Sequence, residues 1–416
     1  MVDRAVIRLG SLTALEMARA RNHWTREARR QLPALRAWRA EFHREPELSN
    51  QETRTREKVL RALAGLGIPA QSFVGNFNGI VGLIESERAG PVVALRADMD
   101  ALPITEETHA PFSSRFEGTM HACGHDVHMA CLLGAAAVLL RNRASLRGSV
   151  KLLFQPAEEE GGRGGALPLL ERGAFENPRV DYVLGQHVAA EVPLGSVGWK
   201  KGALMAAPDT FEIRVRGTPG HASTPHQGPD AVLAAAEIVT GLQALVSRVR
   251  NPVDPVVVTV GTIHGGTRHN VIPREVVLTG TVRTVDPRTR LRAESWIRRR
   301  VRLLAGSMAA TVQIRYTHGY PVLVNDPAAT DRVVEALTAE LGARRLVELK
   351  HPGMGGEDFA RYLEKVPGTF LRLGVATPTM TASSHSGAFL PPESSLVVGT
   401  AALVTGALGL QGKVAA

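Results

Sequence analysis

The sequence lacks the features of a membrane protein or of a small disulfide-linked protein. Only two of its 416 residues are cysteines, Cys123 and Cys131, and aromatic residues make up 5% of the chain. It contains no uninterrupted apolar run of about 18 residues, which a transmembrane helix requires. With so few cysteines, no disulfide framework can replace a hydrophobic core. We therefore expect a globular chain with a core of its own and no membrane partner.

The N-terminus carries no clear targeting signal. The stretch Val6–Leu12 is apolar only in fragments, and charged residues follow it closely. A secretory signal needs a continuous apolar segment and a small-residue cleavage site. We therefore expect a cytoplasmic chain with reduced cysteines, although one disulfide between Cys123 and Cys131 is formally possible. Cys131 stands in the apolar run Ala130–Ala137, so we expect it to pack in the core.

The chain has an excess of positive charge, with 49 Lys and Arg against 40 Asp and Glu, a net charge of +9. Arginines are concentrated at residues 19–44 and 288–302. Both stretches have helical apolar spacing, so these arginines are expected to form solvated helix faces. No nucleic-acid-binding module and no interleaved aromatic stripe accompany them. We expect no nucleic-acid partner, whereas a positive surface can attract small anionic substrates.

Helical and strand-like segments alternate through the first half of the chain. We expect one helix from about residue 15 to 45, ending near Pro46, and a second over Glu52–Leu66. Further strands are expected at Gly79–Ile84, Val92–Ala97, Val150–Gln155 and Asp181–His187, and helices at His125–Arg143 and Gly164–Arg172. This alternation predicts an α/β fold with a mixed sheet that is covered on both faces.

The pattern changes after Trp199 to strand-helix-strand-strand-helix-strand, the order of a ferredoxin-like α+β unit. Its elements are expected at Thr210–Arg216, Asp230–Val249, Pro255–Ile263, Val276–Thr284, Arg288–Ala305 and Ala310–Thr317. The α/β pattern then returns, with helices at Ala329–Leu341 and Ser394–Leu408 and a strand at Thr369–Leu373. We therefore expect an inserted domain, residues 199–312, within a domain formed by residues 1–198 and 313–416.

Side chains that bind metal ions occur in four short segments that are far apart in the sequence. The segments are Met120–Asp126, Phe154–Glu160, Gly185–His187 and Ser384–Ser386, which carry thiol, imidazole and carboxylate side chains. Ligands spread over about 260 residues cannot form a local zinc knot, whose ligands lie a few residues apart. Cys123 and His125 share a glycine-containing loop before a helix, whose N-terminus favours a thiolate. The pattern indicates a hydrolytic metalloenzyme whose site is assembled by a whole α/β domain.

Three consecutive acids, Glu158, Glu159 and Glu160, follow the strand that ends at Gln155. They either form a solvated turn, or one of them binds a metal ion while another acts as a base. Adjacent side chains in an extended segment point in opposite directions. One carboxylate can therefore hold a metal ion while its neighbour takes a proton from water, as a metal hydrolase requires.

Two further acids, Asp98 and Asp100, end the strand before Pro103. An aspartate at such a place commonly orients a metal-binding histidine. Alternatively, the pair caps a turn before the proline. We expect His128, three residues after His125, to be a supporting or packing histidine and not a ligand.

Taken together, these segments resemble the M20 family of metallopeptidases, in particular its aminoacylase-like amidohydrolase branch. That branch includes hippurate hydrolases, N-acyl-amino-acid amidohydrolases and auxin-conjugate hydrolases. The matching motifs are His43 with Pro46-Glu47, Arg96–Pro103, Met120–His128, Gln155–Glu159, Gln186-His187, Gly220–Ala222, His269–Pro273, Gly355–Phe359 and His385.

The resemblance implies two bound divalent ions, of zinc, manganese or cobalt. Cys123 would bridge them, with His125, Glu159, His187 and His385 as the other ligands. Glu158 would be the general base, and we count Asp100 and His221 as further catalytic residues. This chain has Glu160 where the family usually has glycine, so a shift of base and ligand to Glu159 and Glu160 stays open. The family also often has proline at the position of Gly387.

The resemblance further implies a di-metal catalytic domain with an inserted lid or dimerisation domain. In related enzymes the residues equivalent to His221 and Asn270 reach the substrate, in dimers across the subunit boundary. Arg283 matches an arginine that can hold the substrate carboxylate, a task that suits its planar fork. We therefore expect a homodimer or a higher homo-oligomer.

The expected reaction is hydrolysis of the amide bond of a small N-acyl or N-aroyl amino acid, which releases a carboxylic acid and a free amino acid. The alternative is a carboxypeptidase or dipeptidase of the same family, because both kinds of substrate end in a free carboxylate. A binding protein that has lost catalysis is disfavoured, since every expected ligand and the base are intact.

Overall fold

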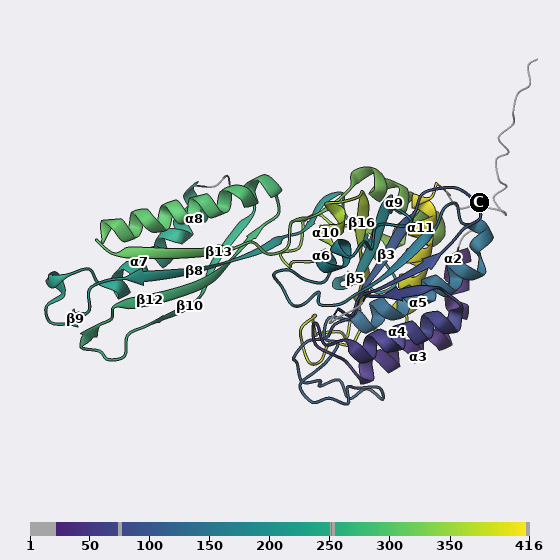
Figure 1. Cartoon of the computed structure of the whole chain (residues 1–416), viewed down its shortest axis with the longest axis horizontal. Coiled ribbons are helices and arrows are strands. Elements are labelled where there is room, and N and C mark those ends of the chain that lie inside the picture. The colour runs from purple at the N-terminus through teal and green to yellow at the C-terminus, as the bar shows by residue number, and fades with distance from the viewer. Residues whose placement is uncertain (1–21, 74–76, 250, 252–253, 413–416) are drawn as a thin grey trace, which may run out of the picture.

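The computed structural model describes residues 22–73, 77–249, 251 and 254–412. Two bodies are visible in Figure 1, one around an eight-stranded sheet and one around a four-stranded sheet. The segment Val6–Leu12 and the first residues of the helix expected from residue 15 lie outside the described residues.

The large sheet has the strand order β1-β2-β4-β3-β5-β16-β6-β15. Its strands are β1 (Ala70–Ser72), β2 (Ile80–Ile84), β3 (Val93–Asp98), β4 (Val150–Gln155), β5 (Tyr182–Pro193), β6 (Val197–Trp199), β15 (Leu346–Glu348) and β16 (Gly368–Ala376). The central strands β4, β3, β5 and β16 are mutually parallel, whereas β2 and β6 run antiparallel to them. The predicted mixed sheet is confirmed.

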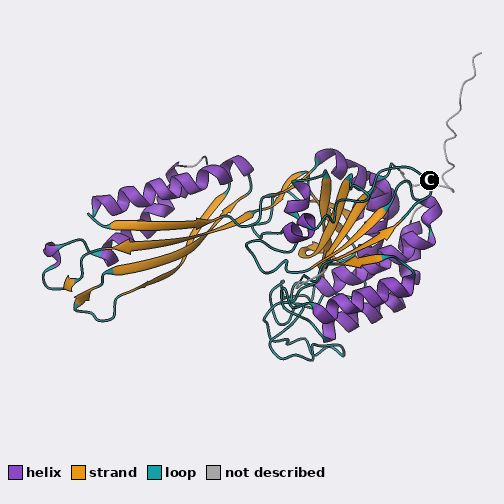
Figure 2. Cartoon of the chain, in the orientation of Figure 1, coloured by secondary structure: helices purple, strands orange, loops and turns teal. Residues whose placement is uncertain are grey.

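Helices cover both faces of this sheet (Figure 2). On one side lie α2 (His23–Arg30), α3 (Leu32–Arg44), α4 (Thr53–Leu66), α5 (His125–Arg141), α9 (Pro327–Leu341) and α11 (Ser395–Leu410). On the other lie α6 (Ala166–Glu171), α10 (Ala360–Leu363) and the small sheet of β7 (Gly202–Met205) and β14 (Leu323–Asn325). Short 3-10 turns, η1 (Arg143–Ser145) and η4 (Ala343–Arg345), complete this body. Because strand side chains alternate, Leu95 and Leu152 join one core and Ala94 and Leu153 the other.

The single helix expected over residues 15–45 is wrong, because α2 and α3 are separate helices that meet at Gln31. Pro33 stands in the first turn of α3. Proline has no N–H to donate, and its ring clashes with the carbonyl four residues earlier, so a continuous helix cannot pass through it.

The smaller body has the antiparallel strand order β10-β12-β8-β13. Its elements are β8 (Ala207–Arg216), β9 (Gly220–His221), η2 (Pro225–Gln227), α7 (Ala231–Ala244), the π-helical turn η3 (Leu245–Val249), β10 (Val256–Gly265), β11 (Val271–Ile272), β12 (Glu275–Thr284), α8 (Pro287–Ser307) and β13 (Thr311–Thr317). The ferredoxin-like order is therefore present, with a separate core between the sheet and helices α7 and α8. The domain boundaries at residues 199 and 312 stay a prediction, and β13 extends past the second of them.

Among the described residues, one helix has the length and mean hydropathy of a membrane span, Ala231–Arg248. Only 39% of that window is buried, and its inward residues Ala234, Ile238 and Leu242 belong to the core of the smaller body. The packed face thus accounts for part of its apolar character.

Helix α8 offers a test of this second core. Ile297 is fully buried in it, whereas Leu291 on the same helix is 76% exposed. We expect Ile297→Ala to lower the free energy of unfolding by about 2–5 kcal/mol, because it removes buried methyl groups and leaves a cavity. Leu291→Ala should change it by no more than about 0.5 kcal/mol. Urea unfolding followed by circular dichroism measures both, and equal effects would contradict the packing of α8.

Candidate metal centre

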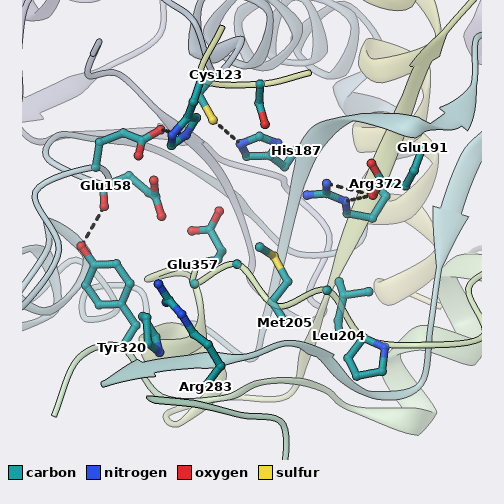
Figure 3. Close-up of a pocket in the computed structure, with 18 of the residues that line it drawn as sticks. Cys123, Glu158, His187, Glu191, Leu204, Met205, Arg283, Tyr320, Glu357 and Arg372 are labelled. Atoms are coloured by element: carbon teal, nitrogen blue, oxygen red, sulfur yellow. Dashed lines mark hydrogen bonds and ion pairs between the residues drawn. The ribbon is translucent and has the colours of Figure 1, made fainter. Parts of the chain in front are cut away.

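A cavity of about 770 Å³ lies where the central parallel strands of the large sheet end. It is lined by Cys123, Glu158, Glu159, His187 and His385, among others (Figure 3). Glu158 and Glu159 follow β4, His187 is part of β5, and His385 comes from the loop after β16. Sites of open α/β sheets form at the carboxyl ends of strands, which explains why distant segments meet here.

The turn that carries Cys123 approaches β5 closely because the next residue is glycine. Gly124 has a φ of 80°, and a Cβ there would lie 2.6 Å from Cγ2 of Val188. Cys123 Sγ consequently lies 3.2 Å from His187 Nε2. Burial, together with the charges of Glu159 and Glu158, raises the pKa of the Cys123 thiol well above its usual value. A thiolate at this place therefore needs a neighbouring cation.

His125 is oriented by its Nδ1, which lies 2.8 Å from the backbone oxygen of Asp100. Its Nε2 is buried and makes no hydrogen bond within the described part of the chain. That atom lies 3.7 Å from Asp98 Oδ2 and 3.9 Å from Glu159 Oε1. A buried ring nitrogen without a partner, facing carboxylate oxygens, fits a site for a cation.

His385 reaches the same place from the C-terminal part of the chain. Its Nε2 lies 3.1 Å from Glu159 Oε1, and its backbone N–H donates to the carbonyl of Ala122 at 2.8 Å. The loop is thus fastened to the turn that carries Cys123. The φ of His385 is 67°, a left-handed conformation that histidine adopts more often than most residues.

Two groups of donor atoms share the cysteine. Cys123, His125 and His187 form one group, and Cys123, Glu159 and His385 form the other, with the donor atoms of each group within 4.8 Å of one another. Sulfur, imidazole and carboxylate donors suit zinc, and related divalent ions also accept nitrogen and oxygen. The donor set therefore fits two divalent ions that share one thiolate.

The three consecutive acids separate by exposure. Glu158 is 7% exposed and lines the cavity, whereas Glu160 is exposed and is not part of the lining. This geometry favours the pair Glu158 and Glu159 over a shift by one residue. Burial, and then the negative charge of Glu357, raises the pKa of the Glu158 carboxyl well above its usual value.

The residues behind the donors hold them in place. His128 Nδ1 lies 2.6 Å from Asp98 Oδ1, and its Nε2 accepts the N–H of Val188 at 2.9 Å. Both ring nitrogens are thus occupied, in agreement with the supporting role expected for His128. Asp100 accepts from Ser49 Oγ at 2.7 Å and from the N–H of Glu159 at 2.8 Å. It is buried and does not line the cavity, so its contacts are those of a positioning residue.

A buried arginine lies beneath the cavity. Arg96 Nη1 lies 2.6 Å from Asp98 Oδ2, and its Nη2 lies 2.9 Å from Asp358 Oδ1 and 3.1 Å from Glu357 Oε1. Its Nε donates to Gln155 Oε1 at 2.9 Å. Asp358 also accepts the N–H groups of residues 165 and 166 at the start of α6. The cluster therefore ties β3, β4 and the segment 357–358 together.

Three of the expected substrate residues are on the smaller body, and only one of them lines the cavity. Arg283 on β12 is part of the lining, and its side chain makes no hydrogen bond or ion pair within the described residues. His221 and Asn270 are exposed; His221 pairs with Val271 in the ladder of β9 and β11, and Asn270 directly precedes β11. Figure 1 shows β9 at the end of the smaller body that is remote from the large sheet. One chain therefore does not bring His221 and Asn270 to its own cavity.

Residues 94–408 match the description of peptidase family M20/M25/M40. The chain belongs to this family. Two relatives named for hydrolases support the assignment. Thermostable carboxypeptidase 1 of Saccharolobus solfataricus is 40% identical over 367 residues, which cover 88% of this chain and 92% of that protein. N-acetyl-L-cysteine deacetylase of Bacillus subtilis is 41% identical over 339 residues, 81% of this chain and 79% of that protein.

A solved structure of the family is also similar. The YXEP protein of Bacillus subtilis, described as a dinuclear metal binding peptidase from the M20 family, is 34% identical with a TM-score of 0.80. The similarity covers 92% of this chain and 99% of that one. Together with the donor groups around Cys123, these findings make the chain a metal-dependent amide hydrolase of the M20 family.

Sequence reasoning missed several residues of this M20 cavity. Tyr320 lines it, is 4% exposed, and donates its hydroxyl to the backbone oxygen of Glu158 at 2.7 Å. No motif pointed to it. Glu357 belongs to a segment that the resemblance includes, but no role was assigned to it. Glu191 and Arg372 face the cavity from β5 and β16 and also lacked a sequence signal.

Tyr320→Phe should slow amide hydrolysis without weakening substrate binding, because it removes only the hydrogen bond that fixes the Glu158 backbone. We expect kcat to fall roughly 3- to 10-fold, the value of one hydrogen bond, with KM, metal content and Tm unchanged. Tyr182→Phe is the matched control, since its hydroxyl accepts from Arg332 at 3.1 Å and is not part of the cavity lining. An equal fall in both variants, or none in Tyr320→Phe, would contradict this role.

Proposed function

We propose that this chain hydrolyses the amide bond of N-acyl and N-aroyl amino acids. The observation that carries the proposal is a cavity that contains candidate metal donors and a buried carboxylate together with Arg283, whose side chain has no hydrogen-bond or ion-pair partner in the part of the chain that the structure describes. A substrate with an amide and a free carboxylate has complementary groups. A relative named for deacetylation of an N-acetyl amino acid, 41% identical, also supports this substrate class.

In this proposal two divalent ions of zinc, manganese or cobalt would be held by the two groups of donors that have Cys123 in common. The other residues that would hold them are His125, Glu159, His187 and His385. When bound, such ions polarise a carbonyl and make water more acidic. Asp100 positions the ligands by its contacts with His125 and the backbone of Glu159.

Glu158 acts as the proton carrier. As a carboxylate it removes a proton from the water that adds to the amide carbon, and it then gives that proton to the departing nitrogen as the C–N bond breaks. Its buried position favours the protonated form, which suits the second of these transfers. Tyr320 keeps its backbone fixed during both.

Arg283 holds the carboxylate of the amino acid. Its guanidinium can donate two parallel hydrogen bonds to a carboxylate. Within the described residues it makes no hydrogen bond or ion pair of its own, although the charge of Asp209 acts on it. Arg283 comes from β12 of the smaller body, whereas the metal donors come from the large one. Substrate binding would thus require both bodies.

We further propose a homodimer in which His221 and Asn270 of a second subunit complete the cavity, since one chain leaves them exposed and remote. His221 would then contribute to catalysis by polarising the amide carbonyl, and Asn270 would bind the substrate. Because such a protein needs a reduced Cys123, and both cysteines are free, we place it in the cytoplasm.

A second candidate is a carboxypeptidase that cleaves short peptides, which the 40% identical relative of that name favours. Peptides also present an amide and a terminal carboxylate. The two functions differ in what lies on the acyl side of the scissile bond, a free ammonium group in a dipeptide and none in an acyl amino acid.

Amine release from N-acetyl, N-benzoyl and indole-acetyl amino acids, compared with dipeptides, tests the proposal. Chelator treatment should abolish release, and zinc, manganese or cobalt should restore it, with acyl amino acids preferred. Glu158→Gln should lower kcat by about 10²–10⁴-fold because it cannot carry the proton, with metal content unchanged. Preference for dipeptides would select the carboxypeptidase, and an active Glu158→Gln variant would remove Glu158 from the reaction.

Mixing two inactive variants tests the shared site. Glu158→Gln and His221→Ala each damage every site of a homodimer, but a mixed dimer contains one intact site. Random exchange of subunits should therefore recover roughly a quarter of the wild-type activity. A mixture that stays inactive, although light scattering shows a dimer and exchange has occurred, would show that His221 acts within its own subunit or not at all.

A further inference from the structure

The wall of the cavity beyond His187 carries an ion pair. Arg372 on β16 is the register partner of His187 on β5. Its Nε and Nη2 donate to the same oxygen, Glu191 Oε1, at 3.2 and 3.0 Å. The arginine side chain is 15% exposed, whereas that of Glu191 is 57% exposed. The largely buried guanidinium of Arg372 is thus covered by the more exposed carboxylate of Glu191.

The two arginines of the cavity differ in their partners. In Figure 3, Arg283 and Tyr320 lie on one side of Met205, and Arg372 with Glu191 lies on the other. Cys123 and His187, two of the proposed metal donors, lie above Met205 in this view. An amide held at the donors would therefore extend one substituent toward each arginine. The Arg283 side chain has no hydrogen-bond or ion-pair partner among the described residues and is available to the amino-acid carboxylate, so the acyl group would extend toward Arg372.

The lining of the cavity is partly apolar. Leu204, Leu349 and Pro352 line the cavity together with the ion pair. A neutral acyl group can contact the apolar side chains without breaking the pair. An acyl group that ends in a carboxylate would be repelled by Glu191, which carries the same charge. Arg372 could otherwise bind that carboxylate, but it is already paired with Glu191. Unfavourable charges of this kind are a common source of specificity.

We propose that Glu191 is a specificity-determining residue that restricts the cavity to neutral acyl groups by covering Arg372. The inference rests on the proposed function and deepens it. Acetyl, benzoyl and similar groups are accepted, and acyl groups derived from dicarboxylic acids, such as succinyl, are excluded. Without Glu191 the planar fork of Arg372 is free to bind a carboxylate through two hydrogen bonds.

The test compares kcat/KM for N-acetyl-, N-benzoyl- and N-succinyl-L-methionine. The wild type should prefer the neutral substrates by at least about tenfold, and Glu191→Gln should raise the value for the succinyl substrate about tenfold while the acetyl value stays within about twofold. Adding Arg372→Gln to Glu191→Gln should abolish the gain. Glu41→Gln is the matched control, since Glu41 pairs with Arg61 at 3.0 Å and is 47% exposed, but is not part of the cavity lining.

Binding is measured in parallel by calorimetry in the Glu158→Gln background, in which no turnover is needed. The added Glu191→Gln change should tighten binding of N-succinyl-L-methionine about tenfold and leave the acetyl compound unchanged. No gain in either measurement, or a gain that persists without Arg372, would overturn the inference. A loss of dipeptide hydrolysis as the sole effect of Glu191→Gln would instead assign Glu191 to the ammonium group of peptides. Absence of turnover with every substrate would reject the proposed function alone, because the binding preference still decides the role of Glu191.

Discussion

The geometry of the metal centre depends on the buried charge of Arg96. Its guanidinium is completely enclosed, so the three acids around it must remain in place to compensate its charge. Each of them extends this constraint to another segment: Asp98 to His128 and the strand beside His187, Asp358 to the start of α6, and Glu357 to the cavity beside Glu158. Loss of Arg96 would leave these buried acids without their cation, and an uncompensated buried charge costs about 3–5 kcal/mol. The cluster therefore fixes the positions of the strand ends. The candidate metal donors that follow these strands are held in place as well.

The donors themselves are poorly stabilised without cations. Burial raises the pKa of the Cys123 thiol, and the Nε2 of His125 has no hydrogen-bond partner in the described chain. Metal ligation requires a thiolate and an unprotonated imidazole nitrogen. The positive charge of the ions stabilises these deprotonated forms and so offsets the free energy of removing the protons. The chain thus holds a set of groups whose arrangement is favourable only with bound ions. Glu158 is different, because it lines the cavity and its backbone oxygen accepts the hydroxyl of Tyr320. In the proposed reaction it would therefore change protonation without moving the candidate ligands.

Much of the fold and part of the site could be predicted from the sequence. Apolar strands followed by acids or histidine identified β3, β4 and β5, and the change of pattern after Trp199 identified the ferredoxin-like unit. Two local features could not be predicted from the apolar pattern. Pro33 separates the first helix into two, and the edge strand β1 has only exposed residues and therefore no apolar signal. The candidate metal donors could be named because each lies in a motif. Tyr320 and the Glu191–Arg372 pair could not, because they become neighbours of the site only through the packing of strands far apart in the sequence.

The most direct test of the account is anomalous diffraction from crystals of the protein loaded with zinc or manganese. The account predicts two anomalous peaks per chain, both within bonding distance of Cys123 Sγ, one shared with His125 and His187 and the other with Glu159 and His385. Glu158 should bind neither ion directly. A single peak, or a pair of peaks that excludes Cys123 or uses His128 as a ligand, would contradict the assignment of the metal centre and the mechanism that depends on it.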